Sequence, residues 1–481
     1  MNMRFFPTFL LLFALACAAL PGANAAGSFR AGAAAIDITP KKLGVSMTGS
    51  FQDRTAIAVA DRLHARGLVI DDGKTRVAIV VCDICLISRE IFDEAKAEAS
   101  KQTGIPVNRM MMSATHTHTA PTAVPLAQCN PTPEYVDQLT AGIARAVVEA
   151  NARLKPARIG WASGIERREI NNRRWYVKEG QIPANPFGRS DDKIRTNPSR
   201  GSNILVRPAG PVDPEVAILS VVNGEGRPVA LLANYGLHYV GGVKPGHLSA
   251  DYFGEFARQA QAFLKADDSF VGIMSNGASG DVNNYNFLKP RPATVPMERI
   301  GVVARRVAVV TYHAWRDMKH SDGVKVTMVE RAIDLGVRKP SADEVAAAKQ
   351  MLAKAADPKR LKMDEIYAQE TVRIDDYPET VNVKLQALRV GELGIVAIPC
   401  EVFAEIGLEI KSRSPLKSTF VIALANGYNG YLPSPAQHEL GGYETWRSGW
   451  SYLETEASTK IIETTLEMLG VLAKGTRSGG N

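Results

Sequence analysis

The sequence predicts an α/β protein with central mixed β-sheets flanked by helices. Short apolar runs, typical of buried strands, alternate with longer amphipathic segments, and this alternation favours layers of helices on sheets. Hydrophobic residues make up 45% and charged residues 22% of the 481 residues, which fits a globular chain. The polar residues that look functional are spread from residue 116 to residue 443, so they must converge. We therefore expect one large domain over residues 26–474, followed by a disordered tail at 475–481.

The strands and helices can be placed in chain order. Strands are expected at residues 66–71, 77–82, 110–114, 216–222, 229–234, 270–274, 383–390, 395–398 and 420–424. Helices are expected at residues 88–102, 133–151, 253–264, 297–318, 342–354 and 453–473. A capping box, Ser341-x-x-Glu344, marks the start of the helix at residue 342. The polar segment 172–202 is expected to be a long loop and a candidate lid or substrate wall, and segment 340–380 a charged surface excursion.

The N-terminus has the pattern of an export signal. Arg4 precedes a mostly apolar run over residues 5–20, and Ala23-Asn24-Ala25 supplies a small-x-small cleavage site. These features predict a secretory signal peptide over residues 1–25 and a secreted or periplasmic location. Cys17 leaves a lipoprotein anchor as the alternative. No later stretch approaches the roughly 18 apolar residues that span a bilayer.

Charge and cysteine content narrow the range of partners. The chain has 57 Lys+Arg against 50 Asp+Glu, a formal net charge of +7, which indicates either a solvated surface or a mild attraction to anionic surfaces. It shows no clustered basic helix, aromatic stacking ladder or nucleic-acid motif. We therefore expect a small-molecule or lipid substrate, no nucleic acid and at most peripheral membrane contact. Cys82, Cys85, Cys129 and Cys400 are expected to be buried thiols, although an oxidising compartment permits disulfides.

The string Thr115-His116-Thr117-His118 indicates a metal site. If residues 110–114 form a buried strand, the i, i+2 spacing puts both imidazoles on one face. The alternative is a pair of surface histidines at a strand end. His238 follows another apolar run and is either a further ligand or a hydrogen-bonded core histidine. Glu401 follows a third such run, where sites of α/β proteins gather, whereas Glu405 is expected to lie in a helix.

These residues carry a family resemblance. The chain resembles the catalytic N-terminal domain of the neutral/alkaline (non-lysosomal) ceramidases, which hydrolyse the amide bond of N-acylsphingosines. The matching pieces cover most of residues 28–460 and run in the family's order: RAGAAAIDITP, RLHARGLVIDDG, VAIVVCDICLIS, SATHTHTAP, INNRR, ANYGLHYVGG, SADYFGEFA, SNGASGDVNN, IPCEVFAEIG and GYNGYLPSPAQHELGGYE. The resemblance implies a zinc-dependent hydrolase that releases a fatty acid and sphingosine.

The resemblance also implies a set of site residues. The zinc ligands would be His116, His238, Glu401 and Tyr431. The catalytic residues around them would be His118 within the site, Arg173 near the reacting amide, Tyr443 as a second tyrosine, and Asp281. Asp281 could orient water, bind a second cation or hold substrate hydroxyls. The alternative for its segment is an Asx-rich turn stabilised by its own side chains.

The chain departs from the family pattern in two respects. Asn283 and Asn284 stand where the ceramidases place a serine and a proline, so zinc-activated water is the expected nucleophile. Ser279 as nucleophile and an inactive site remain as alternatives. The C-terminal β-sandwich of long ceramidases is expected to be missing. The competing functions are hydrolysis of a smaller or more polar amide or ester, and zinc-containing lipid binding without catalysis.

Overall fold

The computed structural model describes Met1 and residues 29–474 except 291 and 294. The expected signal peptide over residues 1–25 and the expected tail at 475–481 lie outside the described residues. Within the part described, no helix has the length and apolarity that crossing a bilayer requires. The four cysteines of this part are buried and free, which confirms the prediction of buried thiols.

The larger of two main sheets has eight strands in the order β16-β14-β13-β8-β1-β5-β6-β7. Its strands are β1 (Arg30–Asp37), β5 (His64–Asp71), β6 (Arg76–Cys82), β7 (Met110–Ala114), β8 (Lys155–Ile165), β13 (Glu215–Asn223), β14 (Pro228–Tyr235) and β16 (Val271–Asn276). The pairs β6–β7 and β14–β16 are parallel and the others antiparallel. The two edges of the sheet approach each other, because Asn276 donates a hydrogen bond to the carbonyl oxygen of Thr115 at 3.1 Å.

The smaller main sheet packs face to face against the larger one. Its order is β18-β19-β20-β22, with β18 (Val326–Gly336), β19 (Thr380–Val390), β20 (Leu393–Ile398) and β22 (Ser418–Ala423), and β20 runs parallel to β22. Leu68 and Ile79 of the larger sheet share one buried apolar cluster with Leu388 and Ile395 of the smaller sheet. This cluster is the core between the sheets, and burial of its apolar surface is the main force that holds them together.

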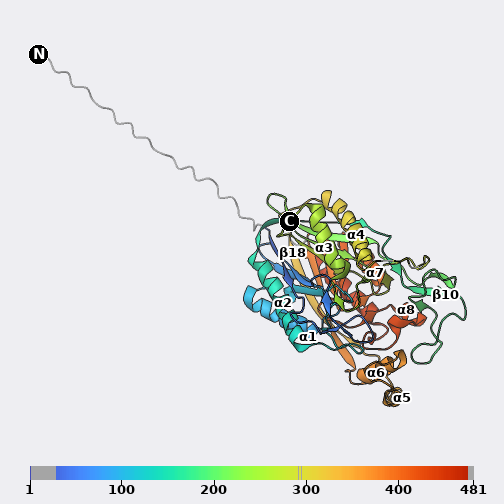
Figure 1. Cartoon of the computed structure of the whole chain (residues 1–481). Helices are drawn as coiled ribbons and strands as arrows, with labels where there is room; N and C mark the ends of the chain where they lie inside the picture. The colour runs from blue at the N-terminus through green and yellow to red at the C-terminus, as the bar shows by residue number, and fades with distance from the viewer. Residues whose placement is uncertain (2–28, 291, 294, 475–481) are drawn as a thin grey trace.

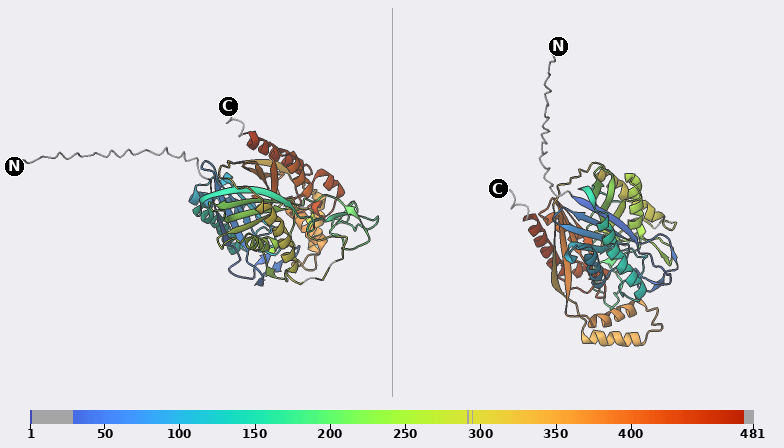
Figure 2. Two further views of the ribbon diagram at one scale, coloured as in Figure 1. Left: turned by 90° about the horizontal axis from the view of Figure 1, so that it is seen from above. Right: turned by 90° about the vertical axis from the view of Figure 1, so that its left-hand side faces the viewer.

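Helices cover the outer faces of both sheets. They are α1 (Arg89–Thr103), α2 (Pro133–Ala152), α3 (Asp251–Leu264), α4 (Glu298–Arg316), α5 (Ala342–Ala353), α6 (Met363–Asp375), α7 (Ala404–Arg413), α8 (Pro435–Leu440) and α9 (Ala457–Lys474). Helix α2 packs on β1 and β5, α3 on β16, α4 on β8 and β13, and α9 on β18 and β19. Figures 1 and 2 show the resulting helix–sheet–sheet–helix layers, with α5 and α6 at one end. The predicted mixed sheets flanked by helices are confirmed.

Most predicted elements are present with shifted ends. The strand at Met110–Ala114 and the capping box of Ser341 and Glu344 are as predicted. The strands β1, β8 and β18 were not expected. Strand β1 is built mainly from alanine, which has low strand propensity, and β8 and β18 lack a continuous apolar run.

The predictions for two segments were only partly correct. Segment 340–380 is not only a surface excursion, because α6 buries Tyr367 and Glu370. Segment 172–202 is not all loop. It contains the end of the short strand β9 (Asn171–Asn172) and all of β10 (Arg174–Val177) and β11 (Arg195–Thr196). Strand β10 pairs with both β11 and β12 (Leu205–Pro208). The other short strands are β2 (Ser46–Met47), β3 (Arg54–Thr55), β4 (Ala58–Val59), β15 (His247–Leu248), β17 (Val282–Asn283), β21 (Glu401–Val402) and β23 (Tyr431–Leu432).

Candidate active site

Three histidines from two loops meet in the interior. His116 and His118 follow β7, and His238 follows β14. The Nε2 atom of His116 lies 3.1 Å from Nε2 of His118 and 3.0 Å from Nε2 of His238. His116 has a φ of 75°, a left-handed conformation that is rare for a residue with a side chain and that clusters at functional sites. The two histidines after β7 therefore converge through a backbone kink beyond the strand, not through alternation along a strand as the spacing predicts.

The other ring nitrogen of each histidine faces a main-chain carbonyl. The Nδ1 atoms of His116, His118 and His238 lie 3.1, 3.1 and 3.0 Å from the carbonyl oxygens of Cys85, Gly49 and Ser279. A carbonyl only accepts hydrogen bonds, so each Nδ1 carries a proton, and each ring in its neutral form turns an Nε2 lone pair toward the same point. Three lone pairs pointed at one another repel unless a cation lies between them. This tautomer pattern is the one found in histidines that ligate metals.

Glu401 completes the arrangement. Its Oε2 atom lies 3.2 Å from Nε2 of His116 and 3.8 Å from Nε2 of His238, and Tyr428 donates a hydrogen bond to its Oε1 atom at 3.1 Å. The side chain is buried, and its Oε2 atom has no hydrogen-bond partner among the described residues. A buried carboxylate oxygen left without a donor needs a counter-charge. The ligand atoms of His116, His238 and Glu401 lie within 4.8 Å of one another and fit a metal ion.

The histidine pKa values point to one positive charge in this cluster. Burial lowers the pKa of His116, but the Cys85 sulfur and the Glu401 carboxylate outweigh it, and the pKa is raised well above its ordinary value. Burial and then the charge on His116 hold the pKa values of His118 and His238 well below theirs. A proton on one ring thus excludes protons from the other two, and a bound cation would replace that proton.

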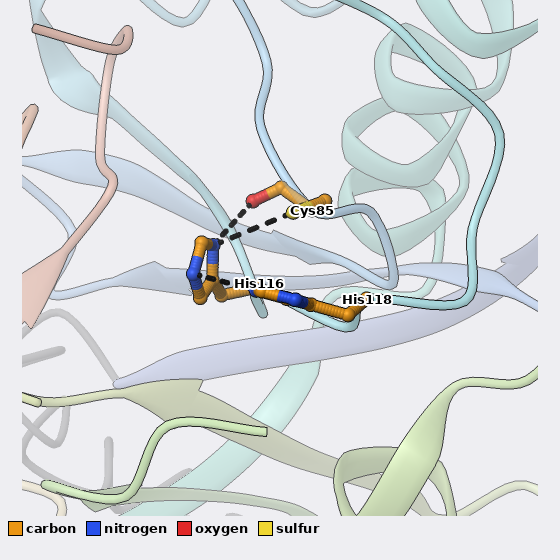
Figure 3. Close-up of side chains that lie close together, drawn as sticks. All are labelled: Cys85, His116 and His118. Carbon is orange, nitrogen blue, oxygen red and sulfur yellow. Dashed lines mark hydrogen bonds between the residues drawn. The ribbon is translucent and has the colours of Figure 1, made fainter. Parts of the chain in front are cut away.

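A second group of candidate ligands, Cys85, His116 and His118, does not form a separate site. The Cys85 Sγ atom lies 3.6 Å from Nδ1 of His116, whereas His118 approaches Nε2 of the same ring. The dashed lines in Figure 3 accordingly start from different nitrogens of His116. Nδ1 of His116 carries a proton and has no lone pair for an ion, so a single ion cannot be shared by Cys85 and His118 through His116.

Arg173 links the histidines to the tyrosines. Its Nη1 atom lies 3.4 Å from Nε2 of His238, and its Nη2 atom donates a hydrogen bond to the Tyr431 hydroxyl at 3.0 Å. Tyr431 pairs in register with Glu401 through the short strands β21 and β23. The Tyr443 ring meets the Tyr431 ring edge-on, with the centroids 5.6 Å apart. Burial, and then the charge of Glu401, raises the pKa values of both tyrosines, so both keep their hydroxyl protons for donation.

The side chains of these histidines and tyrosines, with Cys85, Arg173 and Glu401, line a cavity of about 480 Å³. Its apolar wall comprises Phe51, Leu86, Leu126, Ala127, Ile182, Pro183, Ile194, Tyr443, Trp446 and Trp450. Its polar wall includes Asp192, Arg195, Thr196 and Asn197. Residues from segment 172–202 are present in both walls, so this segment, expected to be a lid or a substrate wall, forms part of the cavity wall. The shape suits a largely apolar ligand with a few polar groups.

The structure does not bring Asp281 to this cavity, so its expected catalytic role is corrected. Asp281 is fully buried, and its carboxylate accepts hydrogen bonds from the Ala404 amide at 2.8 Å and from Nδ2 of Asn172 at 2.7 Å. Its carbonyl oxygen accepts the Arg173 amide at 2.8 Å. Burial raises the pKa of Asp281 to about 6. Asp281 therefore holds the loop of Arg173 against the loop of Glu401. The Asx-turn alternative predicted only bonds within its own segment, whereas these partners are distant in sequence.

Neither Ser279, the alternative nucleophile, nor Asn283, which stands at the family's serine position, lines the cavity that the described residues form. The Ser279 hydroxyl donates to Oδ1 of Asn276 at 2.7 Å, and the Ser279 carbonyl orients His238. Asn283 donates to Oδ1 of Asn197 at 2.8 Å and to the Tyr285 hydroxyl at 2.9 Å. Both side chains support the walls of the site from outside.

The sequence pattern missed three residues of the site. Tyr428 holds Glu401, and the Tyr239 ring stacks on His118 with the centroids 3.7 Å apart and an interplanar angle of 16°. Glu444 accepts a hydrogen bond from Nε of Arg173. Tyr239 follows His238 and Glu444 follows Tyr443 in the chain, so adjacency could have found these two. Tyr428 stands three residues before Tyr431 and is not adjacent to a site residue.

Comparisons with known proteins identify the family and the fold. A family model described as neutral/alkaline non-lysosomal ceramidase, N-terminal, matches residues 29–287. The neutral ceramidase of Pseudomonas aeruginosa is 24% identical over 303 residues, which span 60% of this chain but only 42% of that relative. The crystal structure of the neutral ceramidase from Pseudomonas aeruginosa superposes with a TM-score of 0.69 at 17% identity, and a ceramidase complexed with C2 superposes with 0.72 at 18%. Each covers 93% of this chain and 75% of the other, which establishes the shared fold.

Proposed function

Because this chain belongs to the neutral/alkaline non-lysosomal ceramidase family, we propose that it is a zinc-dependent hydrolase of N-acylsphingosines. The reaction adds water across the amide bond and yields a fatty acid and sphingosine. The observation that carries the proposal is the convergence of three Nε2 lone pairs and an unpartnered carboxylate oxygen inside a mainly apolar cavity. The export pattern at residues 1–25 supports a secreted or periplasmic location.

The donor set fits zinc, because imidazole nitrogen and carboxylate oxygen are its usual ligands in catalytic sites. His116, His238 and Glu401 would hold the ion, and Tyr431, paired in register with Glu401, would be the fourth ligand. Zinc supplies a Lewis acid for the amide carbonyl and makes water nucleophilic near neutral pH. His118 lies beside this set.

The remaining side chains have separate tasks in amide hydrolysis. His118 is neutral because its pKa is lowered, so its Nε2 atom can accept the proton of the attacking water. Arg173 and Tyr443 offer donors to the carbonyl oxygen, on which negative charge develops as the water oxygen bonds to carbon. One such donor contributes roughly 3 kcal/mol. The proton then passes to the leaving nitrogen as the carbon–nitrogen bond breaks, and the apolar wall receives a hydrocarbon chain.

Water as the nucleophile is supported by the position of the alternatives. Ser279 and Asn283 both direct their side chains to neighbouring residues outside the cavity lining. Attack by Ser279 would require its hydroxyl to leave Oδ1 of Asn276 and reach the cavity, and the amide of Asn283 is not an acyl-transfer nucleophile. A hydrolysis that uses water needs no such movement.

The test is release of fatty acid from a short-chain and a long-chain N-acylsphingosine by the purified protein. Activity should disappear with a zinc chelator and return when zinc is added, and His116→Ala should lose both bound zinc and turnover. Hydrolysis that persists in metal-free protein would refute the zinc dependence. Zinc-loaded, folded protein that cleaves neither substrate would refute the ceramidase activity. A smaller or more polar amide or ester would then be preferred, because Asp192, Arg195 and Asn197 make one wall polar.

A further inference from the structure

One buried carboxylate joins two adjacent arginines behind the site. Glu444 is fully buried, and its Oε1 atom accepts a hydrogen bond from Nε of Arg173 at 2.8 Å. Its Oε2 atom accepts from Nη1 of Arg174 at 2.7 Å and from the Thr196 hydroxyl at 2.7 Å. Every polar atom of this carboxylate is therefore bonded within the protein. None is left to contact a substrate.

Arg174 fixes the position of Glu444. It is fully buried, and its other donors go to Oε1 and the carbonyl oxygen of Gln437 and to the carbonyl oxygen of Gly441, at 2.9, 3.1 and 2.8 Å. Arg174 thus belongs to the framework, and it anchors one oxygen of Glu444. The other oxygen of Glu444 is left for Arg173.

The bond from Glu444 determines where the Arg173 guanidinium points. A guanidinium is planar, so fixing its Nε atom leaves little freedom to the two Nη groups. These two groups face Nε2 of His238 at 3.4 Å and the Tyr431 hydroxyl at 3.0 Å, on the cavity side of the residue. Arg173 is 4% exposed, so rotation away from this direction would leave its donors buried without acceptors.

The negative charge of Glu444 also stabilises the buried guanidinium of Arg173 in this position. Two guanidiniums and the candidate metal site lie together in the interior, where like charges repel strongly. Burial raises the pKa of Glu444, but Arg173 and Arg174 outweigh it and lower the pKa, so the carboxylate stays ionised. It offsets one of the two positive charges.

We propose that Glu444 is a positioning residue, which acts through Arg173 to aim its Nη groups at the carbonyl oxygen of the substrate and at the carboxylate of the acid product. This inference rests on the proposed amide hydrolysis. It predicts that the effect of Glu444 on the reaction exists only while Arg173 is present.

The test is a double-mutant cycle of Glu444→Gln and Arg173→Gln on the zinc-loaded full chain. Glu444→Gln should lower kcat roughly 100-fold with little change in KM, as misplacement of a catalytic group does. Adding it to Arg173→Gln should cause no further loss, because the two residues act as a unit. Independent, multiplicative losses would overturn the proposal, and so would full activity of Glu444→Gln.

The matched control is Glu370→Gln. Glu370 is equally buried and accepts hydrogen bonds from the Gly449 amide at 2.9 Å and from Arg373 at 2.7 Å, without contact to Arg173. The variant Glu370→Gln should have the kcat of the wild type, measured on the folded fraction of the protein. If Glu444→Gln does not fold, Glu444→Asp keeps the charge but withdraws the carboxylate by one methylene. It should lie between wild type and Arg173→Gln in kcat, and wild-type activity would overturn the proposal.

Binding of octanoate, a simple acid product, gives a readout without turnover. The dissociation constant should rise about tenfold in Glu444→Gln, in Arg173→Gln and in the double variant alike, since one charge-assisted interaction is lost in each. If the three variants show this equal rise relative to the wild type, but the wild type hydrolyses no amide, the proposed function fails and the role of Glu444 stands. If octanoate affinity is unchanged in the single variants, the role of Glu444 fails.

Discussion

Tyr428→Phe should weaken metal binding without removing a ligand. The Tyr428 hydroxyl donates to Oε1 of Glu401 at 3.1 Å, and Oε2 of Glu401 has no partner among the described residues. The substitution removes the hydrogen bond that Tyr428 donates to the carboxylate and leaves the ring in place. Zinc affinity should therefore fall because Oε2 of Glu401 is no longer held in its direction toward His116 and His238.

The magnitude follows from the role of such outer partners. Removing a group that orients a metal ligand typically costs 10–100-fold in affinity, which is about 1.4 to 2.7 kcal/mol. A hydrogen bond to a buried charged group contributes about 1.5–3 kcal/mol, so the two estimates agree. A total loss of binding is not expected, because the two histidine ligands keep their own carbonyl partners.

The assay is a competitive zinc titration against a chromophoric chelator. The control is Tyr452→Phe. Tyr452 is also a tyrosine whose hydroxyl is hydrogen-bonded, at 2.9 Å to Nδ2 of Asn429, and it makes no contact with Glu401. Zinc affinity should fall in Tyr428→Phe alone. An unchanged affinity in folded Tyr428→Phe, or an equal fall in both variants, would refute the reasoning.

Three further outcomes are expected. Ser279→Ala should keep most of the hydrolysis rate, because the main-chain carbonyl and not the hydroxyl orients His238; loss of turnover with zinc retained would instead make Ser279 the nucleophile. Gly49→Ala should lower kcat, since Gly49 has a φ of 105° and an added Cβ would lie 2.5 Å from Cβ of His118; normal kcat in this variant would contradict the placement of His118. Burial raises the pKa of Asp281 from 3.8 to about 6, so the folded state binds this proton more tightly than the unfolded state. The contribution of Asp281 to stability is therefore full below pH 3.8 and falls by about 3 kcal/mol as the pH rises through 6. Urea unfolding of Asp281→Asn should lack this decline, and parallel pH profiles would contradict it.

Local patterns in the sequence determined much of the architecture. The apolar run Met110–Ala114 forms the expected strand and is followed by His116, and the capping box at Ser341 begins α5. Apolar periodicity and caps depend on neighbours within a few residues, so they are visible without the fold. The ordered motifs were sufficient to indicate the family that the comparison then showed.

The direction of each side chain was decided by tertiary packing. The motif around Asp281 suggested catalysis, yet the amide of Ala404, 123 residues later, captures its carboxylate. Glu444 reaches Arg173 across 271 residues of chain. No local rule relates such positions, because they meet only when the two sheets pack together.

The sequence by itself thus determined which residue types are available: histidines after buried strands, a glutamate after another strand, and tyrosines near the end of the chain. The tertiary structure decided how they are used. It turned the Nε2 atoms of His116 and His238 toward Oε2 of Glu401, and it turned Asp281 away. The physical reason is that buried donors and acceptors must be satisfied, and only the packed interior fixes which partner satisfies each one.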